Sequence, residues 1–254
     1  KKVQIIDNKL RYKVERDINL KLKGKKINKI KRRSKFLIFE IGKSHLMLVH
    51  LGMTGKFFFV DQNKEKFKTS FYYYLNYKKD QKHDRVIFFL NKKQKLIYND
   101  VRKFGFIKLY KSNDMLRISH LKNLGPEPLE KNWNFNYFKN YIINRKRNVK
   151  NILMDQKFVA GLGNIYVNEI LFLSGIRPYR KVKTLENSEI EKIIKNSKNI
   201  LKSSIKLGGS TIKDFSSENG KKGVFQQHFK IYGRKNKKCS NVDCNESIIR
   251  MAIS

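Results

Sequence analysis

Two short stretches of the chain contain groups that could bind a phosphate or a metal ion. Gly-Leu-Gly at 161–163 is followed by Asn164 and a helical pattern, so backbone N–H groups and the positive end of the helix dipole would favour a phosphate there. A simple turn between two helices is the alternative. Cys239 and Cys244 have four residues between them, which fits a single disulfide, two free thiols or half of a tetrahedral zinc site.

The charge of the chain indicates the class of partner. Lys and Arg number 58 against 21 Asp and Glu, which leaves a formal net charge of +37. An excess of this size is the electrostatic footprint of a nucleic-acid-binding protein. The sequence is also crowded with Lys, Asn, Ile, Phe and Tyr, as biased base composition produces. A merely solvated basic surface is therefore the alternative to nucleic-acid binding.

The composition predicts a folded protein. Hydrophobic residues make up 40% and aromatic residues 12% of the 254 residues, enough to bury a core in one large or two modest domains. No apolar run approaches the roughly 18 residues of a membrane span. The first ten residues, KKVQIIDNKL, lack the basic-then-apolar layout of a signal peptide. We therefore expect a soluble intracellular protein.

The chemistry-bearing stretches must be positioned by two kinds of element. Residues 35–110 contain short runs rich in β-branched and aromatic residues, such as KFLIFEI, SHLMLVH, SFYYYLNY and FGFIKLY, with turn signals between them. Strands that recur about every 8–12 residues predict an antiparallel sandwich or barrel. After LGPEPL at 124–129 the period becomes helical, so a second domain is expected to begin there.

Helical periodicity continues through most of the second half. Helices are predicted over about 134–144 and 146–156, and another is expected to start with Asn164 as its N-cap. Residues 188–191 have the pattern of a capping box that opens a longer helix, which ends before Gly208. The tail from 225 has an extended pattern. The predicted class is α+β, with an N-terminal antiparallel β-sandwich followed by a helical domain.

Six motifs in order make the sequence resemble formamidopyrimidine-DNA glycosylases, which are bacterial repair enzymes. The motifs are HLGMTG (50–55), DVRKFG (100–105), LGPEPL (124–129), LMDQKFVAGLGNIYVNEILFLSGIRP (153–178), GGSTIKDF (208–215) and FKIYGRK (229–235). The resemblance implies three domains. These are a β-sandwich over 1–123, a helix–two-turn–helix domain over 124–224, and part of a zinc-finger hairpin over 225–254.

The resemblance implies a base-excision repair enzyme for oxidised purines, such as 8-oxoguanine and formamidopyrimidines, in duplex DNA. Such an enzyme flips the damaged base out, forms a Schiff base and acts as both DNA glycosylase and AP lyase. The family's nucleophile is an N-terminal proline followed by glutamate, and neither stands before Lys1. The family's second cysteine pair does not occur before Ser254 either. We therefore expect an inactive fragment of an active enzyme, with a degenerate glycosylase that binds damage without cutting as the alternative.

Four residues correspond to family positions at the lesion. Lys35 matches a lysine that contacts phosphate or base and assists proton transfer during strand cleavage. Met53, Arg102 and Phe104 match three side chains that fill the space left by the flipped nucleotide. Without the resemblance, Lys35 would be a solvated charge, and Met53 and Phe104 would be core residues. The turn around Met53 favours exposure.

Other matched positions would hold the rest of the DNA. His83 and Arg145 correspond to DNA-contacting residues, although each alone would be taken for ordinary surface charge. Asn164 falls in the helix–two-turn–helix element, where a phosphate is expected. The stretch 215–225 falls where the family has a loop that closes over the everted base. The expected partner is damaged duplex DNA, bound by a monomer without any membrane.

The family's cofactor and location complete the expectations. The resemblance implies one structural zinc ion in the full protein, with Cys239 and Cys244 as half of its ligands. It also implies a bacterial cytoplasmic protein associated with the nucleoid. Two rivals remain, an endonuclease VIII-like glycosylase for oxidised pyrimidines and a non-catalytic damaged-DNA-binding protein. The complete set of three void-filling residues and LGPEPL favour the purine enzyme.

Overall fold

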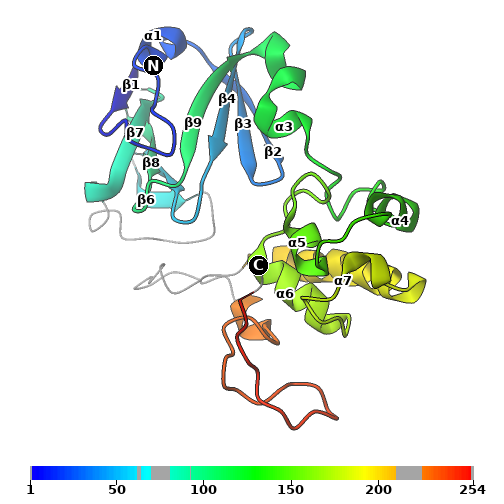
Figure 1. Cartoon of the computed structure of the whole chain (residues 1–254). Coiled ribbons are helices and arrows are strands. Elements are labelled where there is room, and N and C mark those ends of the chain that lie inside the picture. The colour runs from blue at the N-terminus through cyan, green and yellow to red at the C-terminus, as the bar shows by residue number, and fades with distance from the viewer. Residues whose placement is uncertain (1, 62–63, 70–80, 92, 210–224, 253–254) are drawn as a thin grey trace. The chain divides into compact units, whose positions relative to one another are not determined.

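The computed structural model describes residues 2–61, 64–69, 81–91, 93–209 and 225–252 (Figure 1). The described residues divide into two compact units, one that runs to Lys122 and one that begins at Asn123. Each unit has hydrophobic clusters of its own. Over the described ranges, the structure contains no helix that is both long and apolar enough to cross a bilayer.

The first unit contains two antiparallel sheets. The five-stranded sheet has the order β1-β7-β8-β5-β6, with β1 Lys2–Ile5, β5 Lys56–Asp61, β6 Lys64–Thr69, β7 Asp84–Phe89 and β8 Gln94–Asn99. The four-stranded sheet has the order β2-β3-β4-β9, with β2 Ile27–Arg33, β3 Phe36–Ile41, β4 His45–His50 and β9 Phe106–Lys111. Short helices accompany them: α1 Ile18–Leu22, η1 Gln81–His83, η2 Ser112–Arg117 and α3 Ser119–Lys122.

Strand β4 shows why the sequence of this half has a pattern that predicts β-strands. Met47 and Val49 belong to one buried cluster, whereas Leu46 and Leu48 belong to another that includes Ile118. Since alternate side chains of a strand point to opposite faces, both faces of this sheet are covered. The predicted antiparallel β half is confirmed. The predicted run at 70–77 lies outside the described residues.

The second unit is helical. Its elements are α4 Phe135–Ile142, α5 Val149–Met154, α6 Asn164–Leu173, η3 Val182–Thr184, α7 Asn187–Lys206 and η4 Phe225–His228. The asparagine side chains at 134 and 148 cap α4 and α5 by accepting backbone N–H groups. Two predicted caps are wrong. Gly163 rather than Asn164 is the N-cap of α6, and the capping box of α7 joins Glu186 and Glu189 rather than residues 188–191.

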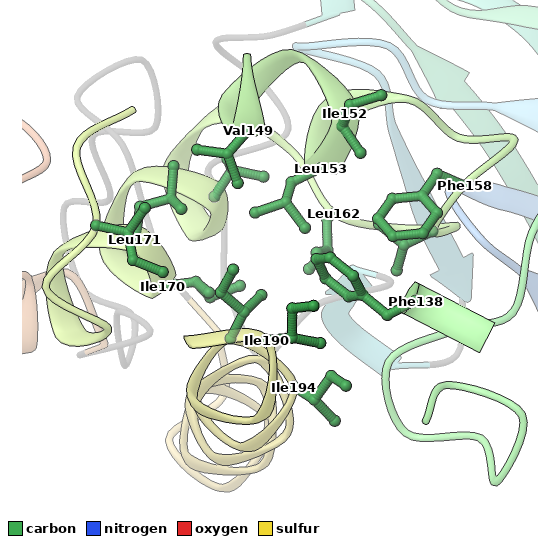
Figure 2. Close-up of a cluster of buried hydrophobic side chains, with 14 of the residues drawn as sticks. Phe138, Val149, Ile152, Leu153, Phe158, Leu162, Ile170, Leu171, Ile190 and Ile194 are labelled. Atoms are coloured by element: carbon green, nitrogen blue, oxygen red, sulfur yellow. The ribbon is translucent and has the colours of Figure 1, made fainter. Parts of the chain in front are cut away.

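One core holds the helices of this unit together. Figure 2 shows side chains from α4, α5, α6 and α7 converging, with Phe158 and Leu162 contributed by the segment between α5 and α6. Trp133 is fully buried, and its Nε1–H donates to Ser197 Oγ at 2.9 Å. Each fully buried Val, Leu, Ile or Phe side chain of this core contributes about 1.5–3 kcal/mol of transfer free energy. The helical half therefore has a substantial core of its own.

The buried carboxylate of Glu169 helps to attach the C-terminal segment to α6. Glu169 is 1% exposed and accepts backbone N–H groups from Lys230, Ile231 and Tyr232 at 2.8, 3.0 and 2.7 Å. Beyond this point the described chain consists of turns, with one isolated antiparallel bridge between Lys238 and Ser247. The predicted extended pattern after 225 is wrong, because turns and η4 occupy this stretch, and the predicted zinc-finger hairpin is not established by it.

Candidate nucleic-acid interface

Two loops of the first unit bring Met53, Arg102 and Phe104 together. Met53 follows β4, and the other two lie between β8 and β9. Met53 is 63% exposed and Phe104 47% exposed, so neither is a core residue. The Arg102 guanidinium lies 4.6 Å from the centroid of the Phe104 ring, which restricts both side chains. The result is an exposed apolar and planar surface with one fixed cation.

The buried carboxylate of Asp100 holds the two loops against each other. Thr54 Oγ1 donates to Asp100 Oδ1 at 2.5 Å, and Thr54 Oγ1 in turn accepts the Arg102 N–H at 3.0 Å. The Gly105 N–H and the Tyr98 hydroxyl donate to Asp100 Oδ2 at 2.9 and 3.3 Å. Burial and the neighbouring Asp100 charge raise the pKa of Tyr98, so its hydroxyl stays a donor. These bonds give the exposed side chains a rigid base.

Glycines allow the two loops to approach this closely. Gly52 has φ +65°, and a Cβ there would lie 2.7 Å from the carbonyl carbon of Phe104. A Cβ on Gly105 would lie 1.8 Å from the Tyr98 hydroxyl oxygen. Neither position can accept a side chain without moving a loop. The glycines in HLGMTG and DVRKFG are therefore packing requirements.

Asp7 anchors the second loop from the other side. It pairs with Lys103 at 2.7 Å and with Arg85 at 3.1 Å, and the Lys103 hydrogen bond is the main cause of its lowered pKa. Lys103 lies in the left-handed region with φ +58°. Because the ammonium of Lys103 is held by Asp7, the neighbouring Arg102 is the cation that this loop presents at the surface.

Lys35 lies in the two-residue turn between β2 and β3, next to Phe36. Phe36 is paired with His50 across β3 and β4, so Lys35 and His50 are at the same end of the sheet. Lys35 has an exposed residue surface, yet surrounding protein desolvates its ammonium enough to lower its pKa. A lysine of this kind can exchange a proton more readily than a fully solvated one.

His50 is a site residue that the sequence reasoning missed. The Gly52 N–H donates to His50 Nδ1 at 3.0 Å, which leaves Nε2 as the protonated nitrogen of the neutral ring. Desolvation, followed by the charges of Lys35, Arg11 and His120, lowers the pKa of His50. The available sequence signal was its place at the start of HLGMTG, directly before the turn that carries Met53.

The structure places His83 beside the loop that carries Arg102 and Phe104. His83 ends η1 and is half-buried, and its carbonyl accepts the N–H of Asp100 at 3.0 Å. Its backbone therefore contributes to the base of the loop that carries Arg102.

Asn164 begins α6 in the second unit and is exposed. The preceding turn is braced by Gln156, whose Oε1 accepts the Gly161 N–H and whose Nε2 donates to the Leu162 carbonyl, both at 2.8 Å. Gly161 has φ +97°, and Leu162 is fully buried. First-turn N–H groups of a helix have no acceptor within the helix, so this start can receive an anion.

Arg145 is held against an aromatic ring just after α4. Its guanidinium lies 4.6 Å from the Tyr141 ring centroid, and its Nε donates to the Tyr141 carbonyl at 3.3 Å. The neighbouring Arg147 instead pairs with Asp155 at 2.8 Å. Of these two exposed arginines, Arg147 has its charge paired with a carboxylate, whereas Arg145 is held by the ring and carbonyl of Tyr141.

The predicted site residues thus form two groups, one in each unit. Lys35, Met53, His83, Arg102 and Phe104 belong to the first, whereas Asn164 and Arg145 belong to the second. Apart from Phe225, the predicted base-covering stretch 215–225 lies outside the described residues.

Cys239 and Cys244 are free, half-buried thiols on either side of a turn. Two thiols fit one half of a tetrahedral zinc site. Among the residues with described positions, no group of three His, Cys, Asp or Glu side chains could hold a metal ion. The pair is therefore compatible with zinc but does not form a closed site by itself.

Comparison with known proteins covers most of the chain. Residues 1–107 match the formamidopyrimidine-DNA glycosylase N-terminal domain, and residues 124–216 match the H2TH domain of the same enzymes. A formamidopyrimidine-DNA glycosylase from Rickettsia bellii is 36% identical over 250 residues, which cover 98% of this chain and 85% of that protein. One from Wolbachia pipientis subsp. Culex pipiens is 38% identical over 230 residues, which cover 91% and 79%.

Solved structures give the same result. The Lactococcus lactis Fpg in complex with DNA containing an abasic site has a TM-score of 0.82 and 31% identity, covering 100% of this chain and 87% of that one. A variant of the same protein in complex with Fapy-dG-containing DNA gives the same values. Both domain matches agree with the similarity over 98% of this chain, so the chain belongs to the formamidopyrimidine-DNA glycosylase family.

Proposed function

We propose that this protein removes oxidised purines from duplex DNA by base excision and then cleaves the strand as an AP lyase. The observation that carries the proposal is the exposed surface of Met53, Arg102 and Phe104 on two braced loops. These exposed side chains do not contribute to core packing. They fit the gap that an extruded nucleotide leaves in a duplex. Relatives that carry the glycosylase name support the reaction.

The three side chains have different tasks in this proposal. Met53 is flexible and polarizable and can occupy an irregular space between bases. Phe104 can wedge between base steps, and Arg102 can donate hydrogen bonds to the base that has lost its partner. Unstacking costs a few kcal/mol, which these contacts offset only when the nucleotide is extruded.

Lys35 and His50 would act on the backbone at the lesion. The lowered pKa of Lys35 makes its amine available for proton transfer during elimination. The Gly52 N–H orients the His50 ring so that Nε2–H can donate to a phosphate oxygen. Both groups lie at one end of the same sheet, so they can serve one stretch of DNA strand.

The second unit would hold the backbone without reading the lesion. The start of α6 at Asn164 offers backbone N–H groups to a phosphate. Arg145 offers a guanidinium whose orientation Tyr141 restricts. His83 would add a contact from the first unit. These contacts position the duplex rather than identify the damage. We also propose that the protein works in the cytoplasm on chromosomal DNA.

A structural zinc ion is also part of the proposal. Cys239 and Cys244 would supply two of its four ligands. Zinc bound there would stabilise the local fold, because in small modules metal binding and folding are coupled. It takes no part in the chemistry at the lesion.

The test is excision by the protein expressed from its whole reading frame. It should release 8-oxoguanine from a duplex, cleave the strand at the resulting abasic site, and form a covalent complex with DNA under borohydride. A preference for oxidised pyrimidines would instead support an endonuclease VIII-like enzyme. Binding to damaged DNA without release of either base class would contradict the proposed activity.

A further inference from the structure

A row of aromatic rings extends the first unit's site across the end of the four-stranded sheet. Phe36, His50 and Phe106 are abreast in the register of β3, β4 and β9. The His50 and Phe106 rings are stacked, with centroids 5.8 Å apart and 16° between their planes. Tyr12 and His120 pack against Phe106, with centroids at 5.1 and 4.9 Å. The row therefore runs from His50 toward residues with no assigned function.

Cations cover the far end of this row. The Lys108 ammonium lies 3.9 Å from the Tyr12 ring centroid, and the Arg11 guanidinium lies 5.9 Å from it. Tyr12 is 37% exposed, so its ring and these cations reach solvent together. The aromatic face attracts both cations and limits their movement. Arg11, Tyr12, Lys108 and His120 are called the rim surface below.

Within the described residues, the two cations of the rim surface have no ion-pair partner. In the part of the chain that the structure describes, neither Arg11 nor Lys108 forms an ion pair. The acids that flank Tyr12 in the sequence are already engaged, Asp7 with Lys103 and Glu15 with Lys21. A surface that concentrates restrained cations without acids favours an anionic partner.

The rim surface is also electrostatically continuous with the lesion site. Besides desolvation, Lys108 and Arg11 lower the pKa of His120, whereas Lys35, Arg11 and His120 lower the pKa of His50. Arg11 is thus close enough to act on both histidines. Successive phosphates of one DNA strand can follow such a row of cations. The Tyr12 hydroxyl adds a hydrogen-bond donor of the type that binds phosphate oxygens.

We propose that the rim surface binds the phosphodiester backbone of duplex DNA next to the lesion site. The inference rests on the proposed function and extends its DNA contact to four residues, none of which reads the base. The rim surface contributes affinity that is independent of damage.

The test measures the salt dependence of binding by fluorescence anisotropy, with the purified protein and with undamaged and abasic-site duplexes. One lost phosphate contact lowers the slope of log K against log [salt] by about 0.9, which corresponds to about eightfold weaker binding at 0.1 M salt. Lys108→Gln and Arg11→Gln should each show this loss, equally on both duplexes. Lys111→Gln is the matched control, since Lys111 is exposed at the other end of β9.

Two further results decide the inference. Tyr12→Phe keeps the ring and should retain most of the slope, whereas Tyr12→Leu should reduce it by releasing both cations. If Lys108→Gln and Arg11→Gln behave like Lys111→Gln while the unchanged protein binds DNA normally, the inference is wrong and an acidic protein becomes the better partner. If the unchanged protein fails to prefer the abasic duplex, the proposed function itself fails.

Discussion

The two units hold their proposed DNA-binding groups in opposite ways. In the first unit, side chains stand on loops that surround the charged, buried carboxylate of Asp100, which only accepts hydrogen bonds. In the second unit, a helix start presents backbone N–H groups on a turn braced by the neutral amide of Gln156, which both accepts and donates. Side chains can distinguish a damaged site, whereas backbone N–H groups recognise any phosphate. Under the proposed function, damage recognition would depend on the first unit's side chains, and general DNA binding on the second unit's backbone groups.

Asp100→Asn is expected to have the largest effect. The substitution keeps the shape but turns one acceptor oxygen into a donor, which must face Thr54 or the donors Tyr98 and Gly105. At least one buried donor then loses its acceptor, so the free energy of unfolding should fall by about 3 kcal/mol. Urea denaturation measures the change. Exposed Asp243→Asn is the control, and equal stability of the two variants would show that the carboxylate is not the organiser of the loops.

Gln156→Glu makes the reverse exchange in the second unit. Its new oxygen would face the carbonyls of Met154 and Leu162, which now accept from Nε2 at 3.1 and 2.8 Å. We expect about 1–2 kcal/mol of destabilisation, because this side chain is only partly buried. The added charge should also weaken binding to damaged and undamaged duplexes by the same factor.

Asn199→Asp on the exposed side of α7 gives the matched charge change away from the turn. Anisotropy titrations of both variants separate the effect of a negative charge at this turn from the effect of a negative charge elsewhere on the unit. If Gln156→Glu weakened binding to damaged DNA alone, the proposed division between damage recognition in the first unit and general DNA binding in the second would be wrong.

His50→Gln should have the smallest effect and tests the titratable group of the first unit. In the folded protein the pKa of His50 is lowered, and its Nδ1 is occupied by the Gly52 N–H. Below the ordinary histidine pKa of about 6.5, the unfolded chain therefore binds the proton more readily, and the free energy of unfolding falls as the pH is lowered. Replacing His50 should reduce that fall between about pH 7 and pH 5 by up to about 1 kcal/mol. Unfolding at pH 7.5 is the reference, and an unchanged pH dependence would contradict the assignment.

Local pattern was enough to predict much of the fold. The strand pattern around 36–41 and 45–50 was readable because these strands are buried or half-buried on both faces. The strand Ile27–Arg33 was missed since INKIKRR is mostly exposed and basic. The α7 cap was misplaced by two residues because a glutamate, not the expected serine, fills that role.

The site was only partly predictable for a related reason. The turn GMTG correctly indicated that Met53 is exposed. The organising role of Asp100 depends on Thr54, which is 46 residues away in the chain, so no local pattern shows it. The rim surface likewise joins Tyr12, Lys108 and His120 from three separate segments of the chain. Contacts made through tertiary packing are the part that sequence patterns leave out.

The most direct test of damage recognition by the first unit is a selectivity measurement. The ratio of dissociation constants for undamaged and abasic-site duplexes should be determined for the unchanged protein and for Met53→Ala and Phe104→Ala. Both side chains are exposed, so the variants should fold normally. We predict that each variant loses about tenfold in selectivity, chiefly through weaker binding to the abasic duplex, because only that state has a space to fill. Equal losses on both duplexes would contradict the account.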